Sequence, residues 1–334
     1  MEKLRIGLIG CGAFGESHLA TMIGIPFLQV VAVTDVIPER AQKLAGRYGV
    51  PRVVRDFREL CALSDVDAVS VVTTEDQHLE PVLFALDQGK HVFVEKPMAT
   101  RVSEAEKMME AAQKAGLLLM PGHILRFETK YATVKEMLAS GQQGRAVFIY
   151  ARRNRPKREG AIYNRTPLPF ETIIHDIDTM LWYTEAKVKR VRAYERQVVV
   201  KNGADLFCST LEFENGALGM IQTMWLLPDG TAVLDDCMQV VTTSAVANID
   251  VTHSGLTVWG EEGQLSPDVS YEPRLRGGVF GALREELSYF ALCVLSGRQP
   301  TVVTAKDGVE AVRVASALVE SAHSDKEVEL ASGL

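Results

Sequence analysis

Short apolar runs alternate with amphipathic stretches along the first 120 residues of the chain. Apolar runs of this length are typical of buried strands, and the stretches between them carry apolar residues at helical spacing. The predicted strands cover 4–9, 28–34, 67–72, 91–94 and 117–120. The predicted helices cover 16–22, 38–48, 57–63, 79–88 and 103–115. Strands that alternate with helices in this way form a parallel sheet with helices on both faces.

Beyond residue 125 the pattern becomes richer in strands. After a predicted helix over 131–139, the predicted strands cover 147–150, 198–200, 207–213, 217–225 and 238–242. Turn sequences at 214–216 and 228–230 are typical of hairpins, so this sheet is expected to be mostly antiparallel. Two predicted helices, over 282–295 and 306–322, close the chain. A sheet face without helices is often covered by another subunit, so we expect a homodimer or homotetramer formed through this sheet.

A glycine-rich turn joins the first predicted strand to the first predicted helix. It reads Gly10-Cys11-Gly12-Ala13-Phe14-Gly15, which is the spacing of a dinucleotide-binding turn. The first glycine permits a tight turn, the second lets a pyrophosphate approach the backbone, and the third lets helix and strand pack closely. The amides at the helix start, including those of Ala13 and Phe14, then face the phosphates. A tight turn that binds nothing is the alternative interpretation of the glycines alone.

Asp35 is a second sign of dinucleotide binding. It follows the predicted strand 28–34 and lies 20 residues after Gly15. A carboxylate at that place accepts hydrogen bonds from both ribose hydroxyls of an adenosine. The same charge would repel a 2′-phosphate, so the sequence favours NAD, while Arg40 five residues further on leaves NADP open.

Composition and charge narrow the possible functions. Hydrophobic residues make up 47% of the 334 residues and the net charge is −7, so no basic surface for nucleic acid is expected. No apolar stretch approaches the roughly 18 residues that span a bilayer, and the first strand begins too early for a signal peptide. The five cysteines are scattered, which is typical of reduced thiols in the cytoplasm. No set of side chains has the spacing of metal ligands, so no metal is expected.

The chain is therefore expected to have two domains. Residues 1–121 are predicted to form an α/β Rossmann dinucleotide-binding domain. Residues 122–334 are predicted to form an α+β domain for substrate binding and oligomerisation, with a large, mostly antiparallel, open-faced sheet. The closing helices of this second domain are candidates for packing back on the first.

Polar residues follow the third and fourth predicted strands. In a parallel sheet the carboxyl ends of the strands face the ligand crevice. Glu95-Lys96-Pro97 follows the strand 91–94, where Lys96 can donate to a substrate hydroxyl, and an exposed turn lysine is the alternative. Thr73 and His78 follow the strand 67–72 and are candidates for lining the nicotinamide ribose. His78 is equally suited to cap the next helix.

A predicted helix over 171–182 places four polar or aromatic residues on one stripe. At about 100° per residue, Glu171, His175, Asp178 and Trp182 fall on the same side, opposite an apolar face. The carboxylate of Glu171 then lies one turn before His175, where it can orient or charge-pair the imidazole. On periodicity alone, an amphipathic surface helix with a solvated histidine is the more common structure.

A basic segment at 152–165 precedes that helix and holds six basic residues against one acid. Its arginines, including Arg152 and Arg155, suit carboxylate or phosphate groups, and Tyr163 lies in the same segment. We expect a loop that closes over an anionic or polyhydroxylated substrate. A solvated loop, or one that pairs with acids across a subunit interface, is the alternative.

These motifs, taken in order, resemble the Gfo/Idh/MocA family of oxidoreductases over nearly the whole chain. The resemblance rests on the glycine turn 10–15, the loop 73–78, Glu95-Lys96-Pro97, Gly122-His123-Ile124-Leu125-Arg126-Phe127 and Ile174-His175-Asp176-Ile177-Asp178. It implies an NAD(P)-dependent dehydrogenase that oxidises a secondary alcohol of a sugar, a cyclitol such as an inositol, or a sugar derivative.

The inositol dehydrogenases of this family use a lysine, an aspartate and a histidine. The resemblance gives Lys96 the role of holding the substrate oxygen and His175 the role of general base. Glu171 stands where those enzymes have aspartate, which opens other substrates. His123 and Arg126 are candidates for lining the substrate pocket, and structural hydrogen bonding is their alternative.

Three other functions stay open on the sequence. Several sugar-nucleotide enzymes of the family resemble the motif at 122–127, which suggests a UDP-sugar 3-dehydrogenase. A non-catalytic NAD(P)-binding regulator would bind cofactor without turnover. An NAD-dependent glycosidase would cleave a glycosidic bond without net formation of NADH.

Overall fold

The computed structural model describes residues 3–163, 165–231, 235–251, 256–261, 263–265 and 267–330. The chain divides into two compact units, each of which is discontinuous in sequence. The first unit holds residues 1–127 and 271–309, and the second holds residues 128–270 and 310–334. The C-terminal part of the chain thus contributes to both units, and the expected domain border between residues 121 and 122 stays a prediction.

The first unit is built on a five-stranded parallel sheet with the strand order β2-β1-β3-β4-β5. The strands are β1 (Leu4–Ile9), β2 (Leu28–Thr34), β3 (Ala68–Val71), β4 (His91–Val94) and β5 (Leu119–Pro121). Almost all of their side chains are buried, as near-continuous apolar runs in a parallel sheet require. The predicted parallel sheet is therefore confirmed.

Helices alternate with these strands, as the sequence predicts. They are α1 (Ala13–Ile23), α2 (Pro38–Tyr48), α3 (Phe57–Cys61), α4 (Leu79–Asp87) and α5 (Val102–Ala115), with short turns η1 (Glu75–Gln77) and η2 (Ile124–Phe127). Within the described part of the chain, no helix is both long enough and apolar enough to cross a membrane.

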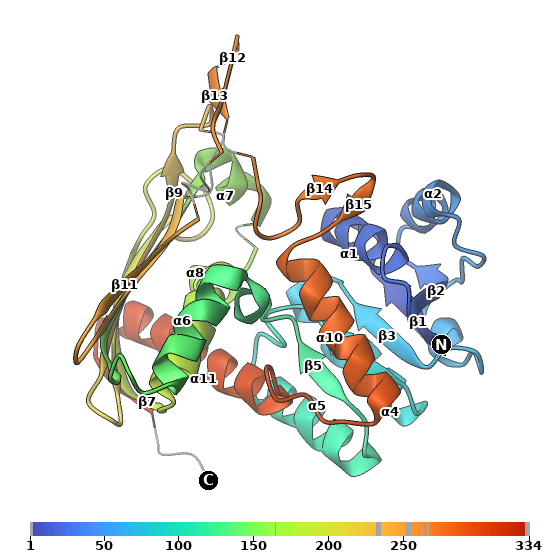
Figure 1. Ribbon diagram of the computed structural model, residues 1–334, viewed down its shortest axis with the longest axis horizontal. Coiled ribbons are helices and arrows are strands. Elements are labelled where there is room, and N and C mark those ends of the chain that lie inside the picture. Colours follow the sequence, from blue (N-terminus) through green and yellow to red (C-terminus); the bar gives the residue numbers. More distant parts are fainter. Residues whose placement is uncertain are drawn as a thin grey trace. The chain divides into compact units, whose positions relative to one another are not determined.

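Helix α10 (Ala282–Ser296) comes from the far end of the sequence but belongs to the first unit. Figure 1 shows it in orange beside the blue strands and helix α1. Leu283, Leu287 and Phe290 enter the same core as the strand residues, and the ring of Phe290 lies 5.8 Å from that of Phe93 on β4. A small hairpin of β14 (Arg274–Leu275) and β15 (Gly278–Val279) precedes this helix.

The second unit contains a seven-stranded sheet with the order β11-β10-β6-β9-β8-β7-β16. All neighbours in it are antiparallel except β6 and β9, so the predicted mostly antiparallel sheet is confirmed. The strands are β6 (Ala146–Pro156), β7 (Val188–Arg196), β8 (Leu206–Phe213), β9 (Leu218–Leu227), β10 (Asp235–Thr242), β11 (Val246–Asp250) and β16 (Val328–Glu329). A separate hairpin joins β12 (Val258–Gly260) to β13 (Gly263–Leu265).

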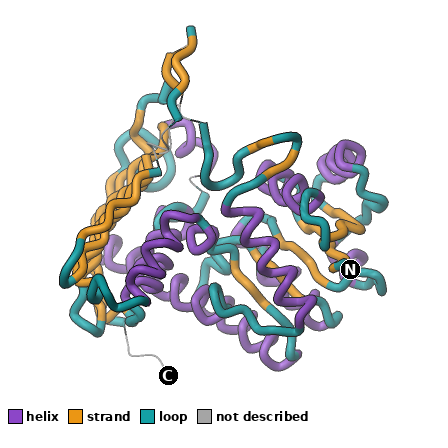
Figure 2. The backbone as a smooth tube through the Cα atoms, viewed as in Figure 1, coloured by secondary structure: helices purple, strands orange, loops and turns teal. Residues whose placement is uncertain are grey.

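The two faces of this sheet differ in what covers them. Helices α6 (Thr129–Ala139) and α9 (Ile174–Thr184) lie along one face, together with the C-terminal half of α11 (Ala305–Ser324) (Figure 2). Side chains alternate along the strands accordingly: Ile221 is fully buried, while its neighbour Met220 is 40% exposed on the other face. No described helix of this unit lies on that second face, which agrees with the predicted open-faced sheet.

The predicted strand at 198–200 is wrong. The strand is β7, which ends at Arg196, and residues 198–200 form a loop. The buried carboxylate of Asp205 accepts hydrogen bonds from the backbone amides of Val198, Val199 and Val200, at 2.8, 2.6 and 2.8 Å. Three valines in a row favour a strand, but amides committed to one carboxylate are not available to a neighbouring strand.

Candidate active site

The glycine turn of the first unit has the shape that its sequence predicts. Gly10 has a φ of +102°, and a side chain on it would clash with the carbonyl oxygen of Val72. A side chain on Gly15 would clash with the carbonyl oxygen of Gly10, so the third glycine is needed where α1 passes the turn. Gly12, in contrast, has open space where its side chain would be. The turn is therefore closely packed at Gly10 and Gly15 but leaves open space at Gly12, which fits a pyrophosphate.

The start of α1 is available to an anion. Gly12 is the residue before the helix, and no described side chain caps this end by a hydrogen bond. Ala13 and Phe14 begin the helix, so their amides lie at the positive end of its dipole. The ring of Phe14 is 39% exposed.

Asp35 is hydrogen-bonded to the same turn. It directly follows β2, and its carboxylate accepts hydrogen bonds from the backbone amides of Cys11 at 2.6 Å and Ile37 at 2.8 Å. The carboxylate therefore stands beside the glycine turn at the carboxyl edge of the sheet. Arg40 lies on the exposed side of α2.

Lys96 lies at the carboxyl edge of the sheet, two residues after the end of β4. The preceding residue, Glu95, extends the pairing of β4 through its amide, which donates to the carbonyl of Val71 at 3.0 Å. The Lys96–Pro97 peptide bond is cis. Residues 95–101 have neither helix nor strand, because α5 begins only at Val102.

Glu95 is buried, with 6% of its surface exposed, and it joins three elements. One carboxylate oxygen lies 3.0 Å from Nε2 of His18 on α1, and the other accepts a hydrogen bond from the amide of Lys96 at 3.1 Å. The other ring nitrogen of His18 lies 3.2 Å from the hydroxyl of Ser70 on β3. No local sequence pattern indicates these contacts, because the partners of His18 lie 52 and 77 residues further along the chain.

His78 is also buried and contacts the segment around Lys96 from another side. Its Nδ1 lies 3.0 Å from the carbonyl oxygen of Pro97, and its Nε2 lies 3.3 Å from the carbonyl oxygen of Thr73. His78 stands at the N-cap position of α4, as the alternative predicts, but its imidazole makes no capping hydrogen bond. Burial lowers the pKa of His78, because the charged ring would lose its hydration.

His175 of the second unit lies in the first turn of α9. The predicted continuous helix over 171–182 is wrong, because Glu171 ends a separate short helix, α8 (Leu168–Glu171), and α9 begins at Ile174. The predicted polar stripe also fails at Asp178, which is fully buried. Glu171 and His175 still lie close in sequence, one at the end of α8 and the other in the first turn of α9.

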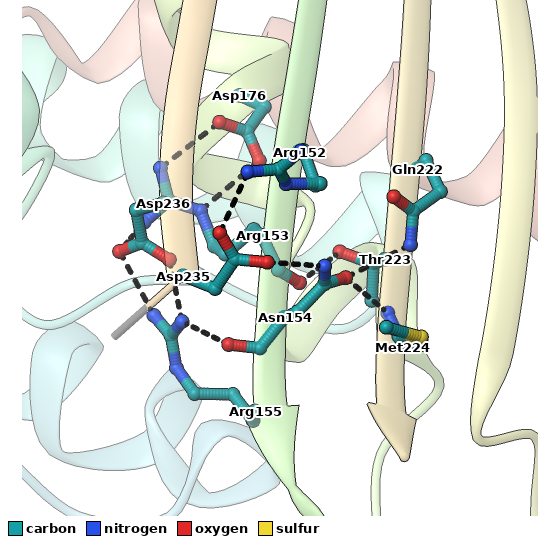
Figure 3. A network of polar contacts seen from close by, with 10 residues as sticks. All are labelled: Arg152, Arg153, Asn154, Arg155, Asp176, Gln222, Thr223, Met224, Asp235 and Asp236. Carbon is teal, nitrogen blue, oxygen red and sulfur yellow. Dashed lines mark hydrogen bonds and ion pairs between the residues drawn. The ribbon is translucent and has the colours of Figure 1, made fainter. Parts of the chain in front are cut away.

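Asp176, the neighbour of His175, anchors α9 to the sheet. Its two carboxylate oxygens accept hydrogen bonds from Nη2 and Nε of Arg153 at 2.9 and 3.0 Å (Figure 3). Nη1 of Arg153 donates to Asp236 on β10 at 2.7 Å, and Asp236 also accepts from Arg155 at 2.5 and 3.1 Å. Arg153, Asp176 and Asp236 are each at most 3% exposed, so this is a buried ionic network.

The prediction of a substrate-closing loop at 152–165 is wrong, because most of this segment forms a strand and a helix. Residues up to Pro156 belong to β6, and Lys157–Tyr163 form helix α7. The antiparallel register sets Asp235 and Asp236 of β10 opposite Asn154 and Arg153, so acids neutralise the basic residues within the sheet. Arg152 pairs with Asp235 at 2.8 Å, as Arg155 pairs with Asp236. Tyr163 ends α7, where partial burial raises the pKa of its hydroxyl.

Arg126 and His123 follow β5 and are both almost fully buried. The guanidinium of Arg126 pairs with Asp307 at 3.2 Å and donates to the carbonyl oxygen of Val302 at 2.8 Å. The guanidinium and hydrogen bonds from Thr304 lower the pKa of the Asp307 carboxyl, although burial opposes them. These contacts match the alternative of structural hydrogen bonding for Arg126, whose side chain connects η2 to the start of α11.

Comparisons with known proteins identify the family. Residues 4–123 match the GFO/IDH/MocA oxidoreductase family with an NAD-binding Rossmann fold, and residues 131–266 match the GFO/IDH/MocA C-terminal domain. The chain belongs to the GFO/IDH/MocA family. Its first unit therefore contains an NAD-binding domain, and the open approach at Gly12 and the uncapped start of α1 fit that cofactor.

Among the GFO/IDH/MocA proteins, relatives with assigned names include inositol dehydrogenases. The chain is 29% identical over 202 residues to inositol 2-dehydrogenase of Salmonella typhimurium, an alignment that spans only 57% of each protein. It is 24% identical over 339 residues to scyllo-inositol 2-dehydrogenase (NAD(+)) of Bacillus subtilis, covering 98% of this chain and 97% of that protein.

The same fold occurs in a solved GFO/IDH/MocA structure. The scyllo-inositol dehydrogenase of Lactobacillus casei, crystallised with NAD(H) and scyllo-inositol, superposes with a TM-score of 0.86 at 22% identity. The match covers 99% of this chain and 100% of that chain. Both predicted domain folds are thereby confirmed.

Proposed function

We propose that this chain is an NAD-dependent dehydrogenase that oxidises a secondary alcohol of a sugar or cyclitol. One observation carries the proposal: the glycine turn, Asp35 and Lys96 all follow strands of one parallel sheet at their carboxyl ends. Dinucleotides and their substrates bind at that edge of such a sheet. An amine at this edge can donate to an alcohol oxygen and favour the loss of its proton.

The chain's own groups give each part of the cofactor a partner. In this proposal the amides of Ala13 and Phe14 bind the pyrophosphate in front of Gly12. Asp35 accepts hydrogen bonds from the ribose hydroxyls, and its charge disfavours NADP. Arg40, Thr73 and Pro97 complete the cofactor contacts. The buried Glu95 and His78 support these residues through their contacts with the backbone of Lys96 and Pro97. NAD, when bound, supplies the acceptor for a hydride at C4 of its nicotinamide.

His175 and Lys96 divide the proton chemistry between them. His175 takes the proton of the substrate hydroxyl as general base, a role that suits an imidazole near neutral pH. Lys96 donates to the same oxygen and stabilises the negative charge that develops on it. Glu171 orients the imidazole or contacts a further hydroxyl. Tyr163 remains a candidate for substrate binding, whereas Arg126, Arg152 and Arg155 are paired with carboxylates of the protein.

The relatives support a cyclitol as the first substrate to test. Inositol dehydrogenases recur among them, and the Bacillus subtilis relative is named with NAD(+). The assay is NADH absorbance with myo-inositol, scyllo-inositol, hexoses, uronates and UDP-sugars, each with NAD or NADP. We expect turnover with a cyclitol or sugar and a preference for NAD. A panel that yields no reduced cofactor would contradict the proposal, and turnover of UDP-sugars alone would change the substrate class.

Two variants test the proposed roles in that assay. Lys96→Ala and His175→Ala should each lower turnover by at least about a hundredfold, the usual scale of general acid–base catalysis, while NADH binding is retained. Lys114→Ala on the exposed side of α5 and His323→Ala on α11 are matched controls that should keep full turnover. Near-normal turnover in Lys96→Ala or His175→Ala would remove that residue from the mechanism.

A homodimer or homotetramer through the sheet of the second unit is part of the proposal. The face without described helices exposes Leu218 and Met220 of β9 by 49% and 40%, and Val246 of β11 by 56%. The register places Phe148 opposite Leu218 and Tyr150 opposite Met220, so these apolar residues are contiguous. Light scattering should give a dimer or tetramer for the wild type and a smaller species for Met220→Lys. A wild-type monomer at micromolar concentration would contradict it.

Cytoplasmic location, which five free cysteines support, also stays a proposal.

A further inference from the structure

We propose that His18 and His78 are positioning residues for Lys96, which they hold from two sides through Glu95 and Pro97. The inference rests on the proposed role of Lys96 and adds two residues to it. Both histidine residues are at most 1% exposed, so in this proposal neither contacts the substrate or the cofactor directly. They act on the backbone that carries the lysine.

The segment around Lys96 needs such support because it lacks regular structure. β4 ends at Val94 and α5 begins at Val102, so residues 95–101 have no helix or ladder of their own. A lysine side chain has a flexible stem, and its ammonium group can be placed only as well as the backbone beneath it. A misplacement of about 1 Å at a reacting group lowers the rate by about a hundredfold.

His18 holds the segment on the side before Lys96. Its Nε2 donates to Glu95, whose second oxygen accepts from the amide of Lys96, so one carboxylate connects α1 to the lysine backbone. The carboxylate can only accept, so this contact places a proton on Nε2, and the hydroxyl of Ser70 lies 3.2 Å from the other ring nitrogen. The ring also contacts Phe14 of the glycine turn, with centroids 4.9 Å apart. The turn and Lys96 are thus linked through two side chains.

His78 holds the segment on the side after Lys96. Its Nδ1 donates to the carbonyl of Pro97 at 3.0 Å, the shorter of its two contacts with backbone carbonyls. A neutral imidazole has one N–H, and burial keeps this ring neutral. The loop after β3 and the segment after β4 are therefore held together at one point, next to Lys96.

The two histidines use different nitrogens, which provides a test that separates positioning from general stability. A glutamine amide reaches the place of Nε2, and an asparagine amide reaches the place of Nδ1. His18→Gln should therefore keep the contact with Glu95, and His18→Asn should lose it. At position 78 the order reverses, so His78→Asn should keep the contact with Pro97 and His78→Gln should lose it. Both amides are polar and comparable in size, so a stability effect alone would not follow this crossed pattern.

The first readout is hydrogen exchange of the Lys96 amide, which does not depend on any activity. That amide donates to Glu95, so its protection should fall in His18→Asn and be retained in His18→Gln. The second readout is turnover, with kcat expected to fall by about tenfold to a hundredfold in His18→Asn and His78→Gln while the affinity for NADH stays within about threefold. In a Lys96→Ala background the same substitutions should cause no further loss, because they act through that lysine.

His91 is the control, since it begins the same strand β4 at its other end and accepts a hydrogen bond from the amide of Leu118 at 3.0 Å. His91→Leu should lower the melting temperature and keep kcat. Equal effects of Asn and Gln at both positions, or a full further loss in the Lys96→Ala background, would overturn the inference. If Lys96→Ala itself keeps its turnover, the proposed function loses Lys96, and the exchange readout still decides whether the histidines hold the segment.

Discussion

Lys96 and His175 are held in place by different physical means. Lys96 follows a strand, where backbone pairing stops, and its segment is fixed by imidazole contacts to one carboxylate and one carbonyl. His175 lies in a helix, whose own hydrogen bonds set its backbone, and the helix is fixed to the sheet by two arginines and two aspartates. The first arrangement relies on single imidazole hydrogen bonds, one of them to a lone buried carboxylate, and the second relies on a network of paired buried charges.

The difference predicts different responses to substitution and to pH. A buried ion pair stabilises a fold only while it is complete, because removing one partner leaves an uncompensated charge in a medium of low dielectric. A buried neutral imidazole lowers the free energy of unfolding at acidic pH, because the unfolded chain binds a proton there and the folded chain does not. The second unit should thus be more sensitive to substitution in its network, and the first unit more sensitive to weak acid.

The largest effect is expected for Arg153→Met. The substitution leaves Asp176 and Asp236 buried without their shared cation, so unfolding free energy should fall by about 3–5 kcal/mol. Chemical denaturation followed by circular dichroism measures this. Arg190→Met, which removes partly exposed pairs with Glu212 and Glu327, is the control and should shift the midpoint far less. An equally small change for Arg153→Met would show that the network is not structural.

The next effect is expected for Glu95→Gln in the first unit. The substitution keeps the shape but removes the charge from hydrogen bonds to His18 and to the amide of Lys96, so stability should fall by about 1.5–3 kcal/mol. Turnover should fall with it, since Lys96 loses its support. Glu80→Gln, at an exposed pair on α4, serves as the matched control. A turnover equal to that of the wild type would contradict the proposed link between Glu95 and Lys96.

A smaller effect is expected from the pH dependence of stability. The pKa of His78 is lowered in the folded state, so its contribution is complete above the ordinary histidine pKa of about 6.5 and is lost as the pH falls below it. The slope for one such group cannot exceed about 1.4 kcal/mol per pH unit. His78→Asn should flatten the curve below pH 6.5, and the exposed His323→Asn should not. Identical curves for His78→Asn and the wild type would be the contrary result.

The smallest effect is expected from salt. Raising the ionic strength from about 0.1 M to about 1 M shortens the Debye length from about 10 Å to about 3 Å, which screens exposed pairs far more than buried ones. The destabilisation by Arg153→Met should therefore be the same at both concentrations within experimental error. A destabilisation that shrinks markedly in high salt would mean that solvent reaches the network.

Much of the first unit could be predicted from the sequence because its signals are local. The glycine turn, Asp35 and Glu95-Lys96-Pro97 each follow an apolar run directly, so the run predicts both the strand and the edge at which they lie. The partners of His18 are distant in sequence, and no short pattern indicates that its ring meets Glu95.

The second unit was harder to predict for the same reason. The basic residues of β6 are paired with Asp235 and Asp236, about eighty positions away, so the segment looks like an exposed loop until the register of β10 is known. Helical periodicity over 171–182 did not reveal the break before Ile174 or the burial of Asp178. Local patterns predict elements, whereas the contacts that hold the site residues arise from tertiary structure.

The most direct test of the central claim is a double-mutant cycle between Lys96 and His175 on kcat/KM for the best substrate of the panel. If both residues act on one alcohol, each single alanine variant should lose at least about a hundredfold, and the double variant should lose little more than the worse single one. Losses that multiply in the double variant would contradict this, since they would mean that the lysine and the histidine contribute independently and are not coupled through one alcohol.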